Sequence, residues 1–372
     1  MRIGIAGGGQ LGRMLVDAAH ALGHSVIILD PTPNSPASQV ADGQIVGDYR
    51  DADMMQSLAE RSDVLTYEIE SVNAEALEKI AAGGMRVHPT PRTLAIIKDK
   101  FSQKTHLRKM GIPVADFMAL NLARKSEGDT LAGLGYPFVL KARSGGFDGR
   151  GNALIQNAAE IRLAVERLGA DVYAERFIKF EKELAIVAAR TVEGEIAVFP
   201  LVETIHKDHI CHMTLAPATV PADVAKKAHE MAQKVLGSFE GAGVFGIEMF
   251  LAEGEVLVNE VAPRVHNSGH WTIEGSETSQ FEQHIRAITG VPLGPTKMKA
   301  QATVMVNILG ERNGPANPRG VTDAEKIQGV KVHLYGKMET RVKRKMGHLT
   351  AVADTLDEAK RNAQLTRAHI SI

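Results

Sequence analysis

The chain has 372 residues, of which 44% are hydrophobic and 23% charged, a composition typical of a globular protein with about two or three domains. Its formal net charge of −1 argues against broad electrostatic binding to nucleic acid or to a membrane surface. The single cysteine, Cys211, excludes an intrachain disulfide and a cysteine metal cluster, and it agrees with a reducing cytoplasm.

The first elements form a β-α-β pattern that opens on a glycine motif. An apolar strand at Arg2–Ala6 runs straight into Gly7–Gly12, which reads G-x-G-x-x-G, so we expect neither a signal peptide nor a membrane span. A helix over Leu11–Leu22 and a strand over Ser25–Leu29 follow, and Asp30 ends the strand. This pattern fits the dinucleotide fingerprint. Two alternatives stay open: another phosphate at the helix N-terminus, or a tight turn without a ligand.

The alternation of strands and helices continues and predicts a doubly wound first domain. We expect helices over 51–60 and 74–80, a strand over Val64–Tyr67 and a short strand at Val87. Glu68 and Glu70 follow the strand at its carboxyl end, where open α/β sheets bind ligands. They could accept hydrogen bonds from a sugar or an amine, or lie on a solvated turn. A helix begins at 98–100 and runs to Met110, before the helix-stopping Gly111.

A lysine and a glycine-rich loop form the most informative segment of the chain. The apolar run 137–140 leads to Lys141, and four glycines follow at 145, 146, 149 and 151, with Arg150 among them. Ala153–Ile155 is apolar again, which places the loop at the tip of a hairpin. Glycine amides, a lysine and an arginine suit phosphate, so we predict a flap over phosphates without Walker spacing. The alternative is a hairpin whose glycines only make turns.

The rest of the segment 114–190 reads as a small α+β unit that carries this flap. We expect a helix over 158–168 and strands over Val172–Glu175 and Glu183–Ala188. The hinge after Glu175 could bind an adenine edge through its backbone, and Glu183 could accept hydrogen bonds from ribose hydroxyls. Such segments are, however, more often strands of a sheet without a ligand. Short strands are expected at 196–199, 201–205 and 210–214, with His206 between the last two, and a helix over 221–239.

A second hairpin brings two carboxylates and an amide together. Apolar runs at 246–251 and 256–260 flank a turn at Glu253–Gly254. A three-residue loop would pair Glu248 with Glu260, whereas a two-residue turn would face Glu248 with Asn259. Either register collects oxygen ligands that suit Mg²⁺ bound to substrate phosphates, and we favour this interpretation over a surface pair.

Polar residues follow this hairpin and recur near the C-terminus. Arg264, His266 and Asn267 lie in an irregular run that could hold an anion beside the metal or simply form an ordered loop. A helix over 278–289 precedes a boundary at 292–295. The tail should contain strands over 302–308, 330–335 and 349–352 and a helix over 355–368 with a capping box. The basic run 337–348 is either a solvated face or a phosphate site.

The flap, the 175–183 segment and the Glu248/Glu260 hairpin together indicate a nucleoside triphosphate with Mg²⁺. At this point the sequence resembles the ATP-grasp superfamily, and within it the 5-(carboxyamino)imidazole ribonucleotide synthases of purine biosynthesis. The resemblance covers nearly the whole chain. It rests on the motifs at 7–12, 35–37 with 41–42, 66–68, 146–151, 259–270 and 279–282, and the runs 264–270 and 345–348 are specific to this family.

The resemblance implies an α/β fold in four parts. These are a doubly wound, Rossmann-like pre-ATP-grasp domain at 1–97, an ATP-grasp lid at 98–190, a metal and nucleotide subdomain at 191–291, and a small C-terminal domain at 292–372 that packs on the substrate site. It also implies a cytoplasmic homodimer. Two positions depart from the family: Phe147 stands where tyrosine is usual, which puts any role of that hydroxyl in doubt, and Lys100 stands where some members have arginine.

The resemblance also assigns roles to individual residues. The reaction would be an ATP-dependent carbon–nitrogen ligation of bicarbonate to aminoimidazole ribonucleotide through carboxyphosphate, with Glu248 and Glu260 holding Mg²⁺. The ATP-binding residues would be Lys100, Lys141, Gly146, Phe147, Asp148, Gly149, Arg150, Gly151, Asn152, Glu175, Arg176, Phe177, Ile178, Glu183, His206, Asn259 and Glu260. The ribonucleotide would contact Gln10, Leu11, Glu68, Lys337, Arg344 and Lys345. The reacting centre would be formed by Asp148, Arg150, Arg264, His266 and Asn267.

Arg264 is our choice for holding bicarbonate, because a guanidinium fork matches a planar oxyanion. Asp148 or His266 could accept the proton of the amine, and the sequence does not choose between them. Three other functions stay open: another ATP-grasp ligase acting on a phosphoribosyl amine such as glycinamide ribonucleotide, an NAD-dependent oxidoreductase using Gly7–Gly12, and a nucleotide sensor without turnover.

Overall fold

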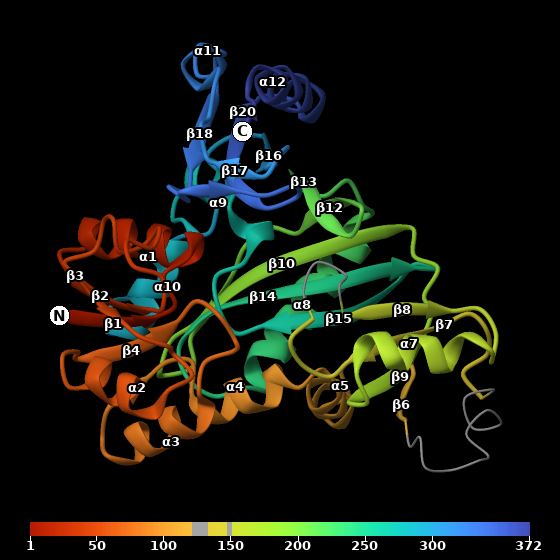
Figure 1. Ribbon diagram of the computed structural model, residues 1–372. Coiled ribbons are helices and arrows are strands. Elements are labelled where there is room, and N and C mark those ends of the chain that lie inside the picture. Colours follow the sequence, from red (N-terminus) through yellow and green to blue (C-terminus); the bar gives the residue numbers. More distant parts are fainter. Residues whose placement is uncertain (121–132, 147–150) are drawn as a thin grey trace.

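The computed structural model describes residues 1–120, 133–146 and 151–372 and arranges them around three main sheets (Figure 1). The first is a five-stranded parallel sheet in the order β3-β2-β1-β4-β5. Its strands are β1 (Arg2–Ala6), β2 (Ser25–Asp30), β3 (Gly43–Val46), β4 (Val64–Tyr67) and β5 (Arg86–Val87). The helices that follow these strands are α1 (Gln10–Ala21), α2 (Ala52–Ala59), α3 (Ala74–Ala82) and α4 (Pro91–Lys98). The predicted doubly wound first domain is confirmed.

A second, four-stranded sheet carries the glycine hairpin and lies at the lower right of Figure 1. Its order is β6-β9-β7-β8, and all of its pairs are antiparallel. The strands are β6 (Phe117–Ala119), β7 (Phe138–Ala142), β8 (Asn152–Ile155) and β9 (Val172–Arg176), and the helices beside them are α5 (Lys100–Lys109) and α7 (Glu160–Leu168). Because β7 and β8 pair as neighbours, the predicted hairpin is present at its two strands.

The third sheet has nine strands and runs through the centre of the molecule. Its order is β15-β14-β10-β12-β13-β16-β20-β18, with β11 paired to β10. The first strands in sequence are β10 (Lys182–Arg190), β11 (Ile196–Val198), β12 (Val202–Lys207), β13 (Ile210–Ala216), β14 (Gly243–Ala252) and β15 (Glu255–Ala262). The C-terminal strands are β16 (Ala302–Leu309), β18 (Val330–Leu334) and β20 (Lys345–Ala353).

Helices cover this sheet and complete separate apolar cores. Helix α8 (Ala222–Gly237) buries Ala228, Val235 and Leu236 against β10 and β15, while α12 (Leu356–His369) buries Ala359 and Ala363 against β16 and β20. The remaining elements are η1 (Asn267–Gly269), α9 (Thr272–Gly275), α10 (Gln280–Thr289), β17 (Gly314–Pro315), α11 (Val321–Ala324) and β19 (Glu339–Thr340). In the described parts of the chain, none of the helices combines the length and the apolar composition that crossing a membrane requires.

The sheets run across two of the expected domain boundaries. Strand β10 lies within 98–190, yet it pairs with β12 and β14 of the central sheet. Strand β16 lies beyond the proline-marked boundary, yet it continues the same sheet by pairing with β13. The four-part division therefore stays a prediction, while the hydrogen bonding joins the segments 182–262 and 302–353 into one sheet.

Two details of the predicted secondary structure were wrong. The helix expected from residue 98 to Met110 is α5, which starts at Lys100, and the preceding helix α4 was not expected. Asp99 separates the two helices in an extended conformation, and its carboxylate accepts from the amides of Phe101 and Ser102 at the start of α5. His206 was expected in a loop, but it lies within β12 and pairs with Cys211 of β13.

Candidate functional site

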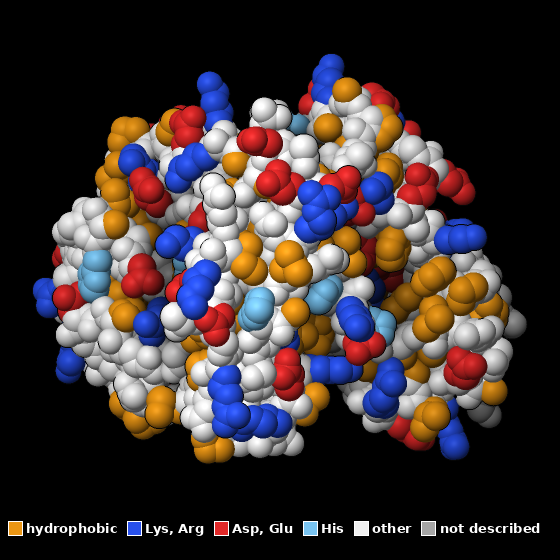
Figure 2. Space-filling view, turned by 90° about the horizontal axis from the view of Figure 1, so that it is seen from above, with side chains coloured by type: hydrophobic (Ala, Val, Ile, Leu, Met, Phe, Trp, Pro, Cys, Tyr) orange, Lys and Arg blue, Asp and Glu red, His pale blue; other side chains and the backbone are white. Residues whose placement is uncertain are grey.

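One cavity of about 2690 Å³ lies between the first domain, the lid and the central sheet. It is large enough for more than one small-molecule ligand. Seen from above, cationic and anionic side chains are interspersed over this face of the molecule (Figure 2). All predicted site residues that the structure describes line it: Gln10, Leu11, Glu68, Lys100, Lys141, Gly146, Gly151, Asn152, Glu175, Arg176, Phe177, Ile178, Glu183, His206, Glu248, Asn259, Glu260, Arg264, His266, Asn267, Lys337, Arg344 and Lys345.

The lid contributes a lysine and the base of the glycine hairpin. Lys141 Nζ lies 2.7 Å from Glu175 Oε1 and donates to Asn259 Oδ1 at 3.2 Å, so it connects the lid with β15. Gly146 and Gly151 face each other so closely that a Cβ on Gly146 would lie 2.7 Å from the Gly151 Cα, which explains glycine at both positions. Four predicted residues at the tip, Phe147, Asp148, Gly149 and Arg150, lie outside the described residues.

The two predicted metal ligands lie opposite each other on β14 and β15. The turn Glu253–Gly254 has two residues, since Ala252 pairs with Glu255. A β-bulge then shifts the register, so that Met249 faces Val258 while Glu248 faces Glu260. The extra residue at the bulge is Asn259. Thus the turn has two residues, as in one of the predicted alternatives, but Glu248 pairs with Glu260, as expected in the other alternative with a three-residue loop.

The electrostatics of this pair favour a cation. Burial raises the pKa of Glu248, and the neighbouring Glu260 raises it further. Burial also opposes ionisation of Glu260, but the Lys100 ammonium, with which it forms an ion pair, lowers its pKa overall. Glu260 lines the cavity and is partly exposed to it. Two facing carboxylates beside one lysine fit a divalent ion that also binds phosphate oxygens. Among the described residues, no group of three or more acidic, histidine or cysteine side chains forms a complete metal site.

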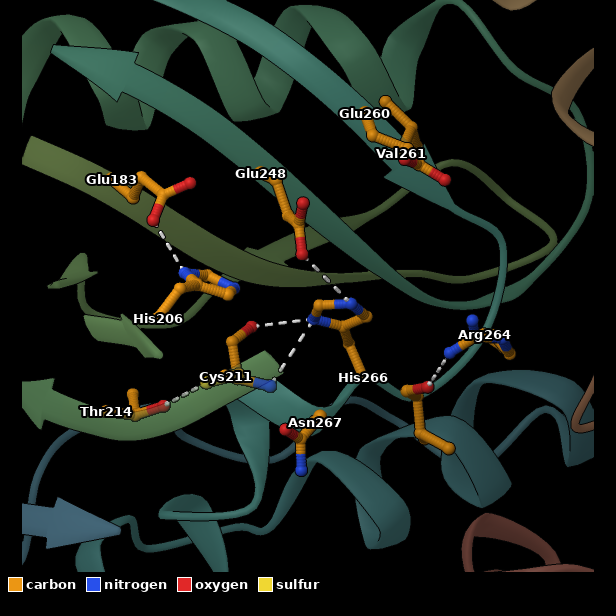
Figure 3. A network of polar contacts seen from close by, with 12 residues as sticks. Glu183, His206, Cys211, Thr214, Glu248, Glu260, Val261, Arg264, His266 and Asn267 are labelled. Carbon is orange, nitrogen blue, oxygen red and sulfur yellow. Dashed lines mark hydrogen bonds and ion pairs between the residues drawn. The ribbon is translucent and has the colours of Figure 1, made fainter. Parts of the chain in front are cut away.

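The irregular run after β15 places Arg264 and His266 beside this pair (Figure 3). Arg264 Nε lies 2.8 Å from Glu70 Oε1, so a carboxylate from the first domain orients the guanidinium. His266 Nε2 lies 3.5 Å from Glu248 Oε1, and its Nδ1 lies 2.8 Å from Ser268 Oγ. Burial lowers the pKa of His266 to about 3, with Arg264 and Lys345 adding to the effect, so the ring is neutral near pH 7. Gly246 on β14 makes room, because a Cβ there would collide with His266.

Two further polar contacts fix neighbouring groups. The amides of Asn267 and Asn307 donate to each other, and Asn307 on β16 is fully enclosed, so the C-terminal part of the sheet orients Asn267. His206 Nδ1 lies 2.6 Å from Glu183 Oε2 on the adjacent strand β10. Burial opposes protonation of this imidazole, but Glu183 outweighs burial and raises the pKa of His206.

The basic cluster of the tail, Lys337, Arg344 and Lys345, also lines the cavity. Lys337 Nζ donates to the carbonyl of Lys345 at 2.6 Å, and Arg344 Nη1 donates to the carbonyl of Glu339 at 2.7 Å, so backbone contacts hold the cluster in place. The side chain of Gln39 donates to the carbonyl of Gly336 at 2.8 Å, which joins this loop to the first domain. The basic cluster and the glycine motif of the first domain therefore line the same cavity.

That glycine motif is occupied by the protein's own carboxylates. The amide of Gly8 donates to Asp30 Oδ2 at 2.8 Å, and the amides of Gly9 and Gly12 donate to Glu68. A dinucleotide would need these amides for its pyrophosphate and Asp30 for its ribose. The geometry therefore disfavours the oxidoreductase alternative.

Sequence reasoning missed an aromatic pair in the cavity wall. The rings of Phe180 and Phe250 stack with centroids 4.9 Å apart, and both residues line the cavity. Phe250 opposes Glu183 across β14 and β10. The alternation of side chains along a strand places Phe250 on the same face as Glu248, and this signal was available in the sequence.

Comparison with known proteins agrees with the arrangement of the chain. Three family models match consecutive segments: a ribonucleotide synthetase preATP-grasp domain at residues 1–98, an ATP-grasp domain at 105–281 and a phosphoribosylaminoimidazole carboxylase C-terminal domain at 303–362. The fold prediction of an ATP-grasp protein with a pre-ATP-grasp domain is confirmed.

Individual proteins match over nearly the whole chain. The N5-carboxyaminoimidazole ribonucleotide synthase of Brucella melitensis is 40% identical over 362 residues, covering 94% of this chain and 96% of the relative. The crystal structure of the synthetase from Thermotoga maritima has 44% identity and a TM-score of 0.90, and covers 100% of this chain and 98% of that one. The synthase from Aspergillus clavatus in complex with ADP and 5-aminoimidazole ribonucleotide has 38% identity and a TM-score of 0.91, with 98% and 97% covered.

Longer relatives also exist: the chain is 43% identical to phosphoribosylaminoimidazole carboxylase of Ogataea methanolica but spans only 68% of its length. The bacterial relative and the two solved structures are instead matched along nearly their full length. By sequence, fold and the order of its segments, the chain belongs to the N5-carboxyaminoimidazole ribonucleotide synthase family of ATP-grasp proteins.

Proposed function

We propose that this chain is an ATP-dependent carbon–nitrogen ligase that carboxylates 5-aminoimidazole ribonucleotide with bicarbonate, giving 5-(carboxyamino)imidazole ribonucleotide, ADP and phosphate in purine biosynthesis. The observation that carries the proposal is the convergence of Lys141, the Glu248/Glu260 pair, Arg264 and Lys345 on one cavity. Related proteins have been solved with ATP and with ADP plus 5-aminoimidazole ribonucleotide, which supports the two substrates.

The nucleotide would lie between the lid and the central sheet. Lys100 and Lys141 supply positive charge for its phosphates, the hinge from Glu175 to Ile178 supplies backbone groups for adenine, and Glu183 accepts from the ribose. Glu248 and Glu260 would hold Mg²⁺, which neutralises charge on the phosphoryl oxygens when bound. The opposed carboxylates, with the raised pKa of Glu248, support this assignment.

Bicarbonate would bind beside this pair, where Arg264 is oriented by Glu70. Transfer of the γ-phosphoryl group to a bicarbonate oxygen gives carboxyphosphate and ADP. Attack of the ribonucleotide's amine on the activated carbon then forms the C–N bond and releases phosphate. Asp148 and His266 remain the two candidates for accepting the amine proton, and Arg150 and Asn267 would support the reacting groups. Closure of the flap would exclude water from the unstable intermediate.

The ribonucleotide would bridge the first domain and the tail. Gln10, Leu11 and Glu68 face the cavity from the first domain, and Lys337, Arg344 and Lys345 face it from the C-terminal segment. A basic cluster at this end suits a 5′-phosphate. We also propose a homodimer in the cytoplasm. The family resemblance supports both the homodimer and the cytoplasmic location. Light scattering during gel filtration tests the homodimer.

The decisive experiment measures ADP release in the presence of bicarbonate and Mg²⁺, with and without 5-aminoimidazole ribonucleotide. We expect release that depends strongly on this ribonucleotide and much less on glycinamide ribonucleotide. A preference for glycinamide ribonucleotide would favour the other ligase. ATP binding without turnover would favour a sensor. A bound nicotinamide absorbance would favour the oxidoreductase.

A further inference from the structure

Lys104 on α5 is a buried cation that none of the roles above uses. Its side chain is 2% exposed and does not line the cavity. Its Nζ lies 3.1 Å from Glu175 Oε2 and donates to the carbonyl of Val258 at 3.2 Å. Burying an ammonium is costly unless it is paired, so this position requires an explanation.

The partner of Lys104 is also the partner of Lys141. Glu175 offers Oε2 to Lys104 and to the Tyr173 hydroxyl at 3.2 Å, while its Oε1 lies 2.7 Å from Lys141 Nζ. The two nearest cations thus share one carboxylate. Burial opposes its ionisation, but Lys141 and Lys104 together lower the pKa of Glu175, so it carries its charge. Burial lowers the pKa of Lys104 to about 8, which leaves it mostly charged at neutral pH.

The charge balance of these three groups decides what Lys141 offers to the cavity. Two ammonium groups and one carboxylate leave a net charge of +1, and Lys141 is the cation that faces the cavity. Without Lys104, Glu175 would form a one-to-one pair with Lys141. A phosphate would then have to compete with that pair.

We propose that Lys104 is a positioning residue that holds the Glu175 carboxylate and thereby keeps the Lys141 ammonium available to the triphosphate. This inference rests on the proposed ATP binding at Lys141. It predicts that Lys104 affects nucleotide binding although it contacts no ligand.

The test is a double-mutant cycle on nucleotide affinity. Binding of Mg-ADP is measured by isothermal titration calorimetry for the wild type, Lys104→Met, Glu175→Gln and the double variant. Lys104→Met should weaken binding on the order of tenfold or more, the loss of one charge-assisted phosphate contact. In the Glu175→Gln background the same substitution should have almost no effect, because no carboxylate remains to neutralise Lys141. The KM for the ribonucleotide should stay unchanged, and Lys109→Met, an exposed position on the same helix, is the matched control.

Each outcome decides the matter. An equal loss in both backgrounds would show that Lys104 only supports the fold, and an unchanged affinity in Lys104→Met would also overturn the inference. If Lys104→Met does not fold, Lys104→Gln, which also removes the charge, takes its place in the cycle: a loss of affinity confined to the background that retains Glu175 supports the inference, and no loss or an equal loss in both backgrounds refutes it. If the wild type binds no Mg-ADP, the proposed function itself fails.

Discussion

Replacing His284 by glutamine should change the pH dependence of stability more than stability itself. His284 is fully buried on α10, where its Nδ1 accepts from the amide of Val244 and its Nε2 lies 2.8 Å from Thr66 Oγ1 of β4. This neutral ring therefore joins the first domain to the central sheet. The glutamine amide has a carbonyl oxygen that can accept from Val244 and an amino group that can donate to Thr66, and it does not ionise.

Burial, helped by His88, lowers the pKa of His284 to about 3 from its ordinary value of 6.5. A histidine whose pKa falls on folding binds more protons in the unfolded state, so stability declines as the pH drops below about 6.5 and towards 3. At about pH 5 the unfolded ring is mostly protonated and the folded ring is not, which costs about 2 kcal/mol relative to pH 8.

The measurement is urea denaturation of the wild type and His284→Gln at pH 8 and pH 5. We expect the variant to lose about 2 kcal/mol less between the two pH values than the wild type does. His229→Gln, at an exposed position on α8, is the control and should not alter the difference. Equal losses in the wild type and in His284→Gln would refute the neutral, buried state of this histidine.

Three further substitutions test the site. Glu260→Gln should reduce Mg²⁺-dependent ADP release by on the order of 100-fold while the melting temperature stays near that of the wild type, and full activity would reject the metal assignment. Lys345→Ala should raise the KM for the ribonucleotide by about tenfold with little change in the KM for ATP, and an unchanged ribonucleotide KM would reject its phosphate role. Gly246→Ala should lower kcat because its Cβ displaces His266, while Mg-ADP affinity measured by calorimetry is retained; an unaltered kcat would show that His266 need not lie against β14.

Elements with a strong local signal could be predicted from the sequence. The bounds of β1 and β4 are those expected, because each is a short apolar strand closed by glycine or acidic residues. Strand β3 (Gly43–Val46) was missed, since all of its residues are at least partly exposed and show no alternation. Helix α4 was missed because its pattern runs into α5, and only the extended backbone of Asp99 separates them.

The candidate site was predicted where its residues cluster along the chain and missed where they meet only in space. Glu248 and Glu260 lie on one hairpin, so their proximity follows from local pairing. Lys104 and Glu175 are brought together by the packing of α5 against the lid sheet and β15, for which a single sequence contains no signal. For the same reason Asn307, which orients Asn267, gave no indication of its role.

The bulge at Asn259 has a consequence for how this hairpin tolerates changes in length. In the regular register of this hairpin Glu248 would face residue 259, so deleting Asn259 would remove the bulge and leave Glu260 opposite Glu248 on the same face of the sheet. Insertions at the distal turn Glu253–Gly254 would leave the pairing of Glu248 with Glu260 untouched. We therefore expect variants of this hairpin that lengthen its tip, or that lose the bulge residue, to keep the two carboxylates opposed.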